Sequence, residues 1–253
     1  MISTILPTFN EAEFIEKNIN IVISSFRLFE TELIVVDDGS TDGTNEIVAK
    51  LLYSIPRAQL ITCSTNLGKG EALRRGVAES SGDVVLFMDA DLSTSLADIE
   101  KFISNLAKFD IVIGSRAVSG AITNNSAIYR ALMGRCYNRL RKLLFLRAVQ
   151  DSQCGFKVFR GDIARKLFGI STCKRFSIDV EILRLAEVLS FSILELPVVW
   201  TAGGKSSVRP IRDSLFMIIE LVVLRLKLSR RRVSALAAKW DKREASKSQS
   251  LDT

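Results

Sequence analysis

The chain has 253 residues, of which 47% are apolar and 25% are charged, and its formal net charge is +7. This composition is that of a globular protein and excludes disorder over most of the length. The length suits one large domain, or one domain with an appendage, better than two full domains. The sequence contains no histidine, which excludes Ser-His and Cys-His nucleophile pairs.

The cysteine pattern and the first residues of the sequence bear on the cellular compartment in which we expect the protein. The cysteines form no C-x-x-C pair, so we expect no zinc site and no disulfide framework, and the pattern favours reduced thiols in a cytosolic setting. The first residues lack the basic and apolar regions of a secretory signal. The longest apolar run, Leu215 to Leu224, is interrupted by Glu220 and is shorter than the ~20 residues of a membrane-spanning helix. We therefore expect the chain not to cross a membrane.

Short runs rich in aliphatic and β-branched residues recur through the first half, each with the length of a buried parallel strand. They are Ile2–Leu6, Leu33–Val36, Leu60–Thr62, Val84–Met88 and Ile111–Ile113. The stretches between them have apolar residues at helical spacing. This alternation predicts an α/β fold with a Rossmann-like, mostly parallel sheet and helices on both of its faces.

The second half departs from this alternation. A basic helical stretch is expected from about Ala127 to Leu146, and a strand from Phe191 to Trp200. An amphipathic helix with basic residues downstream follows. The sequence thus predicts a domain over residues 1–210, an amphipathic basic segment over 211–243 that lies on a membrane surface, and a disordered tail over 244–253. The alternative for the amphipathic segment is a helix that packs on the domain and has a solvated basic end.

Lysine and arginine are concentrated between Arg130 and Arg147 and again between Arg225 and Arg243. Such clusters favour a polyanionic partner, which can be a phosphate, an acidic lipid surface or a nucleic acid. No recognisable nucleic-acid-binding motif is present, so nucleic acid is the least favoured of the three.

The polar residues that follow each strand are the candidate site, because ligands bind beyond the carboxyl ends of the strands in an open parallel sheet. Asp89-Ala90-Asp91 stands out among them. Two carboxylates two residues apart at a strand end can present oxygen ligands to one hard cation, Mg²⁺ or Mn²⁺. The alternative is that one aspartate caps a helix that begins near Leu96 while the other is solvated.

Two further loops have the composition of ligand-binding turns. Asp37-Asp38-Gly39-Ser40 can accept hydrogen bonds from a nucleotide base, or it can be an Asp-Gly turn followed by a serine cap, and both can hold at once. Asn66-Leu67-Gly68-Lys69-Gly70 places a lysine among glycines at a helix N-terminus, which suits a phosphate, although it is not a Walker motif.

Taken in order, these motifs resemble those of the family 2 glycosyltransferases, which are inverting enzymes with the GT-A fold. The matching segments are Pro7 to Glu11, Val36 to Thr44, Asn66 to Gly70 and Met88 to Leu92. Later segments resemble the dolichyl-phosphate β-glucosyltransferase branch, within the transferases that act on polyprenyl phosphates. These segments are Ile113 to Arg116, Gln150 to Lys157 and Arg175 to Glu181. The resemblance covers about residues 1 to 212.

The resemblance implies a role for each matching residue. The residues that would hold the nucleoside are Pro7, Asn10, Glu11, Asp37 and Asp38. Lys69 would face the nucleotide, and Asp89 and Asp91 would hold the cation and the donor diphosphate. The residues that would receive the acceptor phosphate are Arg116, Arg130 and Arg209.

The chain departs from the branch in two respects. The branch usually carries one or more membrane segments, and none is expected here, which leaves attachment at the cytoplasmic face of a membrane. In Gly204-Lys205-Ser206-Ser207-Val208 a serine stands where the branch has lysine, so the acceptor contacts of this loop differ from the usual pattern.

The implied reaction is transfer of glucose from uridine diphosphate glucose to a polyprenyl or dolichyl phosphate, with inversion. The cation would neutralise the leaving diphosphate while the arginines orient the acceptor. Three alternatives remain: a guanosine diphosphate mannose donor, a saccharide hydroxyl acceptor in surface polysaccharide synthesis, and a non-catalytic module that binds nucleotide-sugar or nucleic acid. The intact aspartates argue against the last.

The role of Asp151 depends on the acceptor. A hydroxyl is a poor nucleophile until a general base removes its proton. A lipid phosphate needs no base, because its second pKa is about 6 and it is already largely dianionic at neutral pH. Asp151 lies where family members that act on hydroxyls carry the base, and for a phosphate acceptor we predict that it orients instead.

Overall fold

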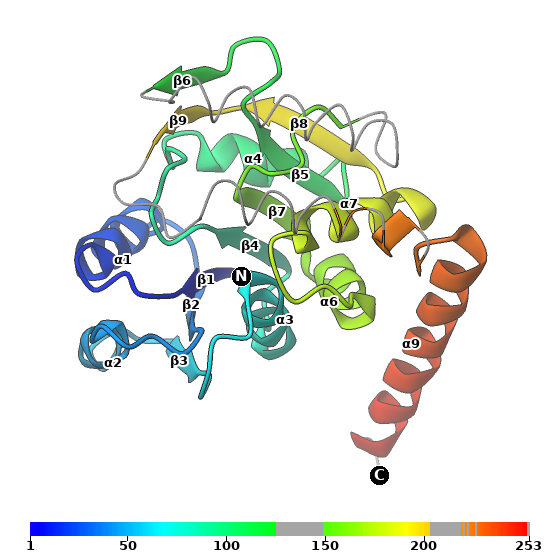
Figure 1. Ribbon diagram of the computed structural model, residues 1–253, viewed down its shortest axis with the longest axis horizontal. Helices are drawn as coiled ribbons and strands as arrows, with labels where there is room; N and C mark the ends of the chain where they lie inside the picture. The colour runs from blue at the N-terminus through cyan, green and yellow to red at the C-terminus, as the bar shows by residue number, and fades with distance from the viewer. Residues whose placement is uncertain (125–148, 203–218, 220, 222, 226, 252–253) are drawn as a thin grey trace.

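The computed structural model describes residues 1–124, 149–202, 219, 221, 223–225 and 227–251. At its centre is a seven-stranded sheet with the order β3-β2-β1-β4-β7-β5-β8 (Figure 1). The strands are β1 (Ile2–Thr8), β2 (Thr31–Asp37), β3 (Ala58–Thr62), β4 (Val84–Met88), β5 (Ile111–Ser115), β7 (Phe156–Arg160) and β8 (Ile193–Pro197). Only β7 runs antiparallel to its neighbours in this sheet. The predicted mostly parallel sheet is confirmed, and each predicted strand of the first half lies within β1 to β5.

Helices cover both faces of the sheet, because the strands are apolar on both sides. In β2, Leu33 and Val35 enter one core cluster, and Ile34 and Val36 enter the other. The helices of the Leu33 face are α1 (Ile15–Ser25), α2 (Thr44–Leu52) and α4 (Ile99–Asn105). Those of the Ile34 face are α3 (Lys69–Glu79), α6 (Gly161–Ile170) and α7 (Ile178–Val188). The predicted layers of helix, sheet and helix are therefore present.

The run Phe191–Trp200, predicted as one strand, is divided between two sheets. Its first part is β8, and its last part is β9 (Val199–Thr201), which pairs with β6 (Ile122–Asn124). The change of sheet occurs at Val198, whose amide donates to Ser115 O (3.3 Å) while its carbonyl accepts from the Ile122 amide (3.0 Å). The apolar pattern is continuous through this run, so it could not show that the first part pairs with β5 and the last part with β6.

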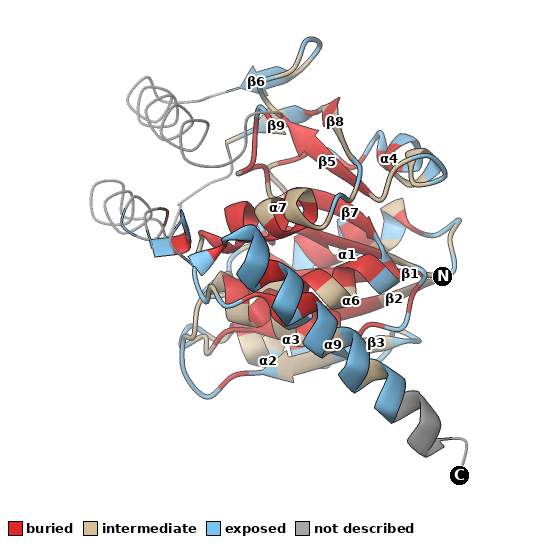
Figure 2. Cartoon of the chain, turned by 90° about the vertical axis from the view of Figure 1, so that its right-hand side faces the viewer, coloured by how far each residue is buried: buried red, intermediate tan, exposed pale blue. Residues whose placement is uncertain are grey.

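The C-terminal part packs on α6 and α7 through α9 (Arg230–Leu251) and the described residues that precede it. Their buried apolar side chains are Leu221, Leu224, Leu228, Val233 and Ala237. The ring of Trp240 lies against Gly169, and Lys166 Nζ forms an ion pair with Asp241 at 2.9 Å. Figure 2 shows that the side of α9 facing away from the domain is exposed over residues 230–246.

The C-terminal helix reaches into the stretch predicted as a disordered tail, and the predicted division of the chain into domain, basic segment and tail stays a prediction. The helix α9 continues to Leu251, beyond the predicted start of disorder at 244. A helix already held by tertiary contacts extends readily, since each added residue gains one hydrogen bond without a new nucleation cost. The predicted helical stretch over 127–146 lies outside the described residues, as does the predicted domain boundary at 210. Across the described part of the chain, no helix combines the length and apolar character needed to cross a membrane.

Candidate functional site

The loops after β1 and β2 are joined by hydrogen bonds from backbone amides to side-chain oxygens at the carboxyl edge of the sheet. The Asn10 amide donates to Ser40 Oγ (2.9 Å), and the Thr41 amide donates to Asn10 Oδ1 (2.9 Å). The Glu11 amide donates to Thr44 Oγ1 (2.9 Å). Asn10 has φ of 56°, a conformation that asparagine adopts more readily than most residues. These contacts bring the predicted nucleoside residues of the two loops together.

Asp37 and Asp38 are both buried and both accept hydrogen bonds from their own or the next loop. Asp37 accepts from the amide and hydroxyl of Ser40, so the predicted Asp-Gly turn is present. Asp38 accepts from the amides of Leu67 (2.8 Å) and Gly68 (2.7 Å). Asp38 thereby links the second loop to the Asn66–Gly70 loop, and its nucleoside contact stays a prediction.

Lys69 is the first residue of α3, and its side chain points to carboxylates rather than away from the fold. Its Nζ lies 2.8 Å from Asp89 Oδ1 and 3.1 Å from Asp179 Oδ2. The loop before it is tight: Gly68 has φ of 101°, and a Cβ there would lie 2.5 Å from Lys174 O. Only glycine meets both requirements without strain.

Asp89 and Asp91 follow β4 in a turn that other elements hold. Asn18 Nδ2, from α1, donates to Ala90 O (2.7 Å). The Asp91 carboxylate accepts from the amide (3.0 Å) and hydroxyl (2.7 Å) of Ser93. The next helix, α4, begins at Ile99 with Asp98 as its N-cap residue. The alternative in which Asp89 or Asp91 caps this helix is therefore wrong.

The carboxylates around this turn repel one another. The pKa of Glu11 is raised to about 7 by burial and by the charges of Asp91, Asp42 and Asp89. Burial also raises the pKa of Asp89, and Asp179 and Asp91 add to this effect while Lys69 opposes it. A divalent cation would relieve this repulsion, so the donor set fits one.

The protein ligands near this turn are few. In the ranges that the structure describes, no group of three or more His, Cys, Asp or Glu side chains is arranged to hold a metal on its own. Asp89 and Asp91 together form a two-carboxylate pair, which suits Mg²⁺ or Mn²⁺ that completes its shell with phosphate oxygens and water.

Asp89 also depends on Gly155, which precedes β7. The Asp89 amide donates to Gly155 O (3.0 Å), and a Cβ at Gly155 would lie 1.7 Å from Asp89 Oδ2. We expect Gly155→Ala to lower the free energy of unfolding by about 1–3 kcal/mol, the usual cost of overpacking. The three atoms nearest to that Cβ all belong to the Asp89 carboxylate group. In an Asp89→Ala background the cost should therefore disappear, and an equal cost in both backgrounds, measured by urea denaturation, would contradict this contact.

Arg116, just after β5, is held by Asp151. Its amide (2.9 Å) and Nε (2.7 Å) donate to Asp151 Oδ2, and its Nη2 donates to Oδ1 (3.0 Å). The guanidinium lies 5.5 Å from the ring centroid of Trp200. Glu195 accepts from the amides of Gln150 (2.6 Å) and Asp151 (2.9 Å), which fixes the loop that carries Asp151. This geometry agrees with an orienting role for Asp151.

The remaining predicted residues have different outcomes. Pro7 lies in β1, paired in register with Val36. Arg130 and Arg209, the other predicted acceptor residues, lie outside the described residues, so only Arg116 of that group is placed. Burial would raise the pKa of Asp151, but the hydrogen bonds and charge of Arg116 outweigh it and lower the pKa below its ordinary value.

Two residues that the sequence analysis gave no role also reach this site. Lys157 of β7 is fully buried, and its Nζ forms a close ion pair with the buried Asp179 of α7. Asp179 in turn contacts Lys69. A lysine between the apolar residues Phe156 and Val158 of a strand is the signal that could have found this pair, because a buried ammonium requires a partner.

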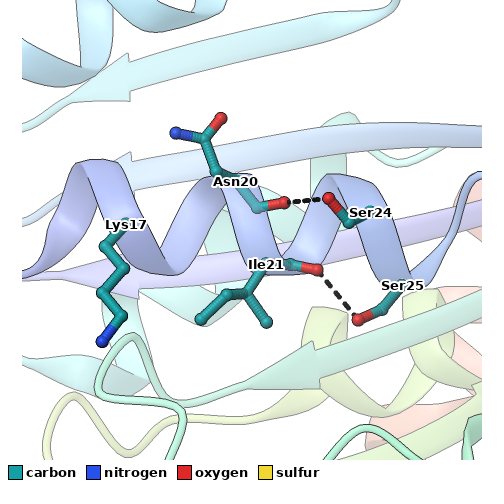
Figure 3. Close-up of a pocket in the computed structure, with 5 residues that line it drawn as sticks. All are labelled: Lys17, Asn20, Ile21, Ser24 and Ser25. Atoms are coloured by element: carbon teal, nitrogen blue, oxygen red, sulfur yellow. Dashed lines mark hydrogen bonds between the residues drawn. The ribbon is translucent and has the colours of Figure 1, made fainter.

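A separate surface hollow lies along the outer side of α1 (Figure 3). Its lining residues are Lys17, Asn20, Ile21, Ser24 and Ser25. The hydroxyls of Ser24 and Ser25 donate to the helix carbonyls of Asn20 and Ile21 (2.8 Å each). The hollow therefore offers no set of converging polar groups, and the strand ends remain the candidate site.

Comparison with known proteins agrees with the order of motifs and with the fold. The family model "Glycosyl transferase family 2" matches residues 3–168. The chain is 32% identical over 232 residues to the dolichyl-phosphate beta-glucosyltransferase ALG5C of Trichomonas vaginalis, with 86% of this chain and 68% of that protein covered. It is 30% identical over 243 residues to the human dolichyl-phosphate beta-glucosyltransferase, with 89% and 75% covered.

Among solved structures, the fold resembles glucosyl-3-phosphoglycerate synthase from Mycobacterium tuberculosis, crystallised with Mn²⁺, uridine-diphosphate-glucose and phosphoglyceric acid. The TM-score is 0.67 at 21% identity, with 90% of this chain and 79% of that chain covered. This likeness confirms the predicted GT-A fold. From the family match and the sequence relatives, the chain belongs to glycosyltransferase family 2 and is a glycosyltransferase.

Proposed function

We propose that this glycosyltransferase moves glucose from uridine diphosphate glucose to a polyprenyl or dolichyl phosphate, with inversion at the anomeric carbon. The observation that carries the proposal is the arrangement at the carboxyl ends of the strands. There the Asp89 carboxylate lies beside the Lys69 ammonium, Asp91 follows in the same turn, and Arg116 is held by Asp151 at the end of β5. Sequence relatives that bear the name dolichyl-phosphate beta-glucosyltransferase support the choice of donor and acceptor.

Asp89 and Asp91 are the residues that would hold a divalent cation, Mg²⁺ or Mn²⁺. When bound, the cation supplies positive charge against the diphosphate of the donor. Lys69 adds a second positive charge at the same end of the site. Asn10, Glu11, Asp37 and Asp38 form the joined loops proposed to hold the nucleoside, with Pro7 at the end of β1.

Arg116 would receive the acceptor phosphate, with Arg130 and Arg209 as proposed partners. Asp151 holds the Arg116 guanidinium in a two-point contact, so the donors that remain on the guanidinium have a defined direction. The pKa of Asp151 is lowered. It would remain ionised near neutral pH and would not carry a proton, which suits a phosphate acceptor that needs no general base.

Calorimetric titration with uridine diphosphate tests the donor half of this proposal. We expect binding in Mn²⁺ or Mg²⁺ that weakens at least tenfold when EDTA removes the cation, because the cation joins the carboxylates to the diphosphate. Guanosine diphosphate in the same titration tests the mannose alternative. Binding that is unaffected by EDTA, or binding of single-stranded nucleic acid without uridine diphosphate binding, would contradict the proposal.

We further propose that the protein associates with the cytoplasmic face of a membrane through the outward side of its C-terminal helical residues. Arg225, Lys227, Arg230 and Arg231 are exposed there, and Ile219 and Val223 are exposed apolar side chains nearby. Basic residues near an anionic surface each contribute about 1 kcal/mol to binding. A lipid-phosphate acceptor would be reached from such a surface.

Vesicle flotation tests this attachment. Changing Lys227, Arg230 and Arg231 to glutamine should reduce partitioning onto phosphatidylserine vesicles by about 100-fold, from three charges at about 1 kcal/mol each. The matched control removes three exposed lysines elsewhere, Lys50, Lys101 and Lys108, and should partition as the unchanged protein does. Equal loss in both variants would show that binding depends on net charge alone and not on this surface. If the unchanged protein did not float with acidic vesicles, the proposed membrane attachment would be rejected.

A further inference from the structure

Four side chains of alternating charge form a continuous row from the core to the candidate site. Lys157 Nζ pairs closely with Asp179 Oδ1, Asp179 Oδ2 lies 3.1 Å from Lys69 Nζ, and Lys69 Nζ lies 2.8 Å from Asp89 Oδ1. Exposure of the side chains rises along the row, from 0% for Lys157 and 2% for Asp179 to 13% for Lys69 and 42% for Asp89. The inner pair is therefore shielded from water, and the outer pair faces the site.

The Asp179 carboxylate is held by two ammonium groups, those of Lys157 and Lys69. Lys157 Nζ also donates to Cys154 O (2.7 Å) and lies 5.1 Å from the centroid of the Phe87 ring, so the ammonium cannot move without losing these contacts. Asp179 lies in the first turn of α7, where the helix dipole favours a negative charge. Burial alone would raise the pKa of Asp179, but the ammonium groups of Lys157 and Lys69 outweigh burial and lower it. Asp179 is thus a fixed negative charge behind Lys69.

The carboxylates of Asp89 and Asp179 both contact the ammonium group of Lys69. If Asp89 were its only partner, the ammonium would neutralise a carboxylate that the proposed cation needs. Asp179 takes part of that interaction and holds the ammonium from behind, because its Oδ2 contacts Lys69 on the buried side. Asp89 then shares the ammonium with Asp179 and is not its only partner.

We propose that Asp179 is a positioning residue of the donor site, which holds Lys69 so that the Asp89 carboxylate stays available to a divalent cation. The proposal rests on the proposed function and adds a residue to it. Asp179 acts through Lys69 and is not placed in contact with substrate. Outer partners of metal-binding residues commonly change metal affinity by about 10- to 100-fold when they are removed.

Two variants separate positioning from net charge. Asp179→Asn removes one negative charge and leaves the buried Lys157 without its partner, which is expected to lower stability as well. The double variant Lys157→Met with Asp179→Asn removes one charge of each sign, so the net charge around Asp89 is that of the unchanged protein. If only net charge mattered, the double variant would bind cation normally. A matched control on the same helix, Glu187→Gln, removes the ion pair with Arg184 (3.0 Å), about two helical turns beyond Asp179.

The measurement is calorimetric titration of each folded protein with Mn²⁺ alone and then with uridine diphosphate at saturating Mn²⁺, with thermal unfolding recorded in parallel. We expect the Mn²⁺ affinity to be about tenfold weaker in both Asp179 variants. In the Glu187→Gln control we expect it to equal that of the unchanged protein. In a Lys69→Met background, Lys157→Met with Asp179→Asn should cause no further change, because the effect passes through Lys69. Mn²⁺ affinity in the double variant equal to that of the unchanged protein would overturn the positioning role.

The same titrations distinguish this inference from the proposed function. If the unchanged protein binds uridine diphosphate with Mn²⁺ and the double variant matches it, the Asp179 inference fails while the donor proposal stands. If the unchanged protein binds Mn²⁺, and Asp179 variants weaken it, but uridine diphosphate does not bind, the donor proposal fails while the contact between Asp179, Lys69 and Asp89 stands.

Discussion

Asp91→Ala is expected to lower hexose transfer by about a thousandfold, because it removes one of the two proposed cation ligands and with it the charge opposite the leaving diphosphate. The side chain is exposed, and its carboxylate bonds to Ser93 within the same turn. Loss of such a contact at the surface should change the free energy of unfolding by no more than about 0.5 kcal/mol. The fold should therefore be unchanged while turnover is lost.

Asp98→Ala provides the matched control for this variant. Asp98 is an exposed aspartate a short distance along the same segment, and its side chain makes no capping hydrogen bond with α4. Initial rates with uridine diphosphate glucose and a polyprenyl phosphate, measured over a range of Mn²⁺, should be near normal for Asp98→Ala. Metal-dependent turnover of Asp91→Ala close to that of the unchanged protein would show that the Asp89 and Asp91 pair has been assigned wrongly.

Arg116→Ala is expected to lower turnover by about 100- to 1000-fold, since it removes the charge that positions the acceptor phosphate. It also leaves the buried Asp151 carboxylate without its cation, which is expected to cost about 3–5 kcal/mol of stability. Rate loss in this variant alone could therefore follow from unfolding. The double variant Arg116→Ala with Asp151→Asn should recover most of the stability and none of the rate.

Asp151→Asn alone is expected to lower the rate only modestly, because an asparagine oxygen can still accept from Arg116. The lowered pKa of Asp151 determines how its contribution to the free energy of unfolding changes with pH. Its contribution to stability is present at neutral pH and is lost as the pH falls below about 4, the ordinary aspartate value, through the lower folded pKa. If Asp151→Asn instead abolished turnover and removed the acidic limb of the pH profile, a general base and a hydroxyl acceptor would be implicated.

Much of the sheet could be predicted from the sequence, and β7 shows why part of it could not. The strands β1 to β5 are short apolar runs separated by helical spacing, which is a local signal. In β7 the run Phe156–Arg160 carries a lysine at its second position. Its burial depends on Asp179, which lies 22 residues further along the chain. No local pattern contains that partner, although the helical spacing of Ile163, Ala164 and Leu167 did offer a signal for α6.

The candidate site likewise has residues that a local motif could predict and contacts that no single motif could. Asp89, Asp91 and Lys69 were found because each follows a strand or begins a helix within a short motif. The contact between Lys69 and Asp89 joins two motifs, and neither motif alone indicates it. Gly155 was likewise visible only as part of a longer segment, and its purpose became evident once β7 was seen to run antiparallel beside β4.

The most direct test of the proposed reaction is a donor panel incubated with a polyprenyl phosphate and analysed by mass spectrometry of the lipid. The panel should contain uridine diphosphate glucose, guanosine diphosphate mannose and uridine diphosphate galactose, each with Mn²⁺, Mg²⁺ or EDTA. We predict a lipid phosphate that gains one hexose from uridine diphosphate glucose, only when a divalent cation is present. No hexosylated lipid phosphate with any donor, together with hexose transfer to a free saccharide hydroxyl, would contradict the proposed reaction.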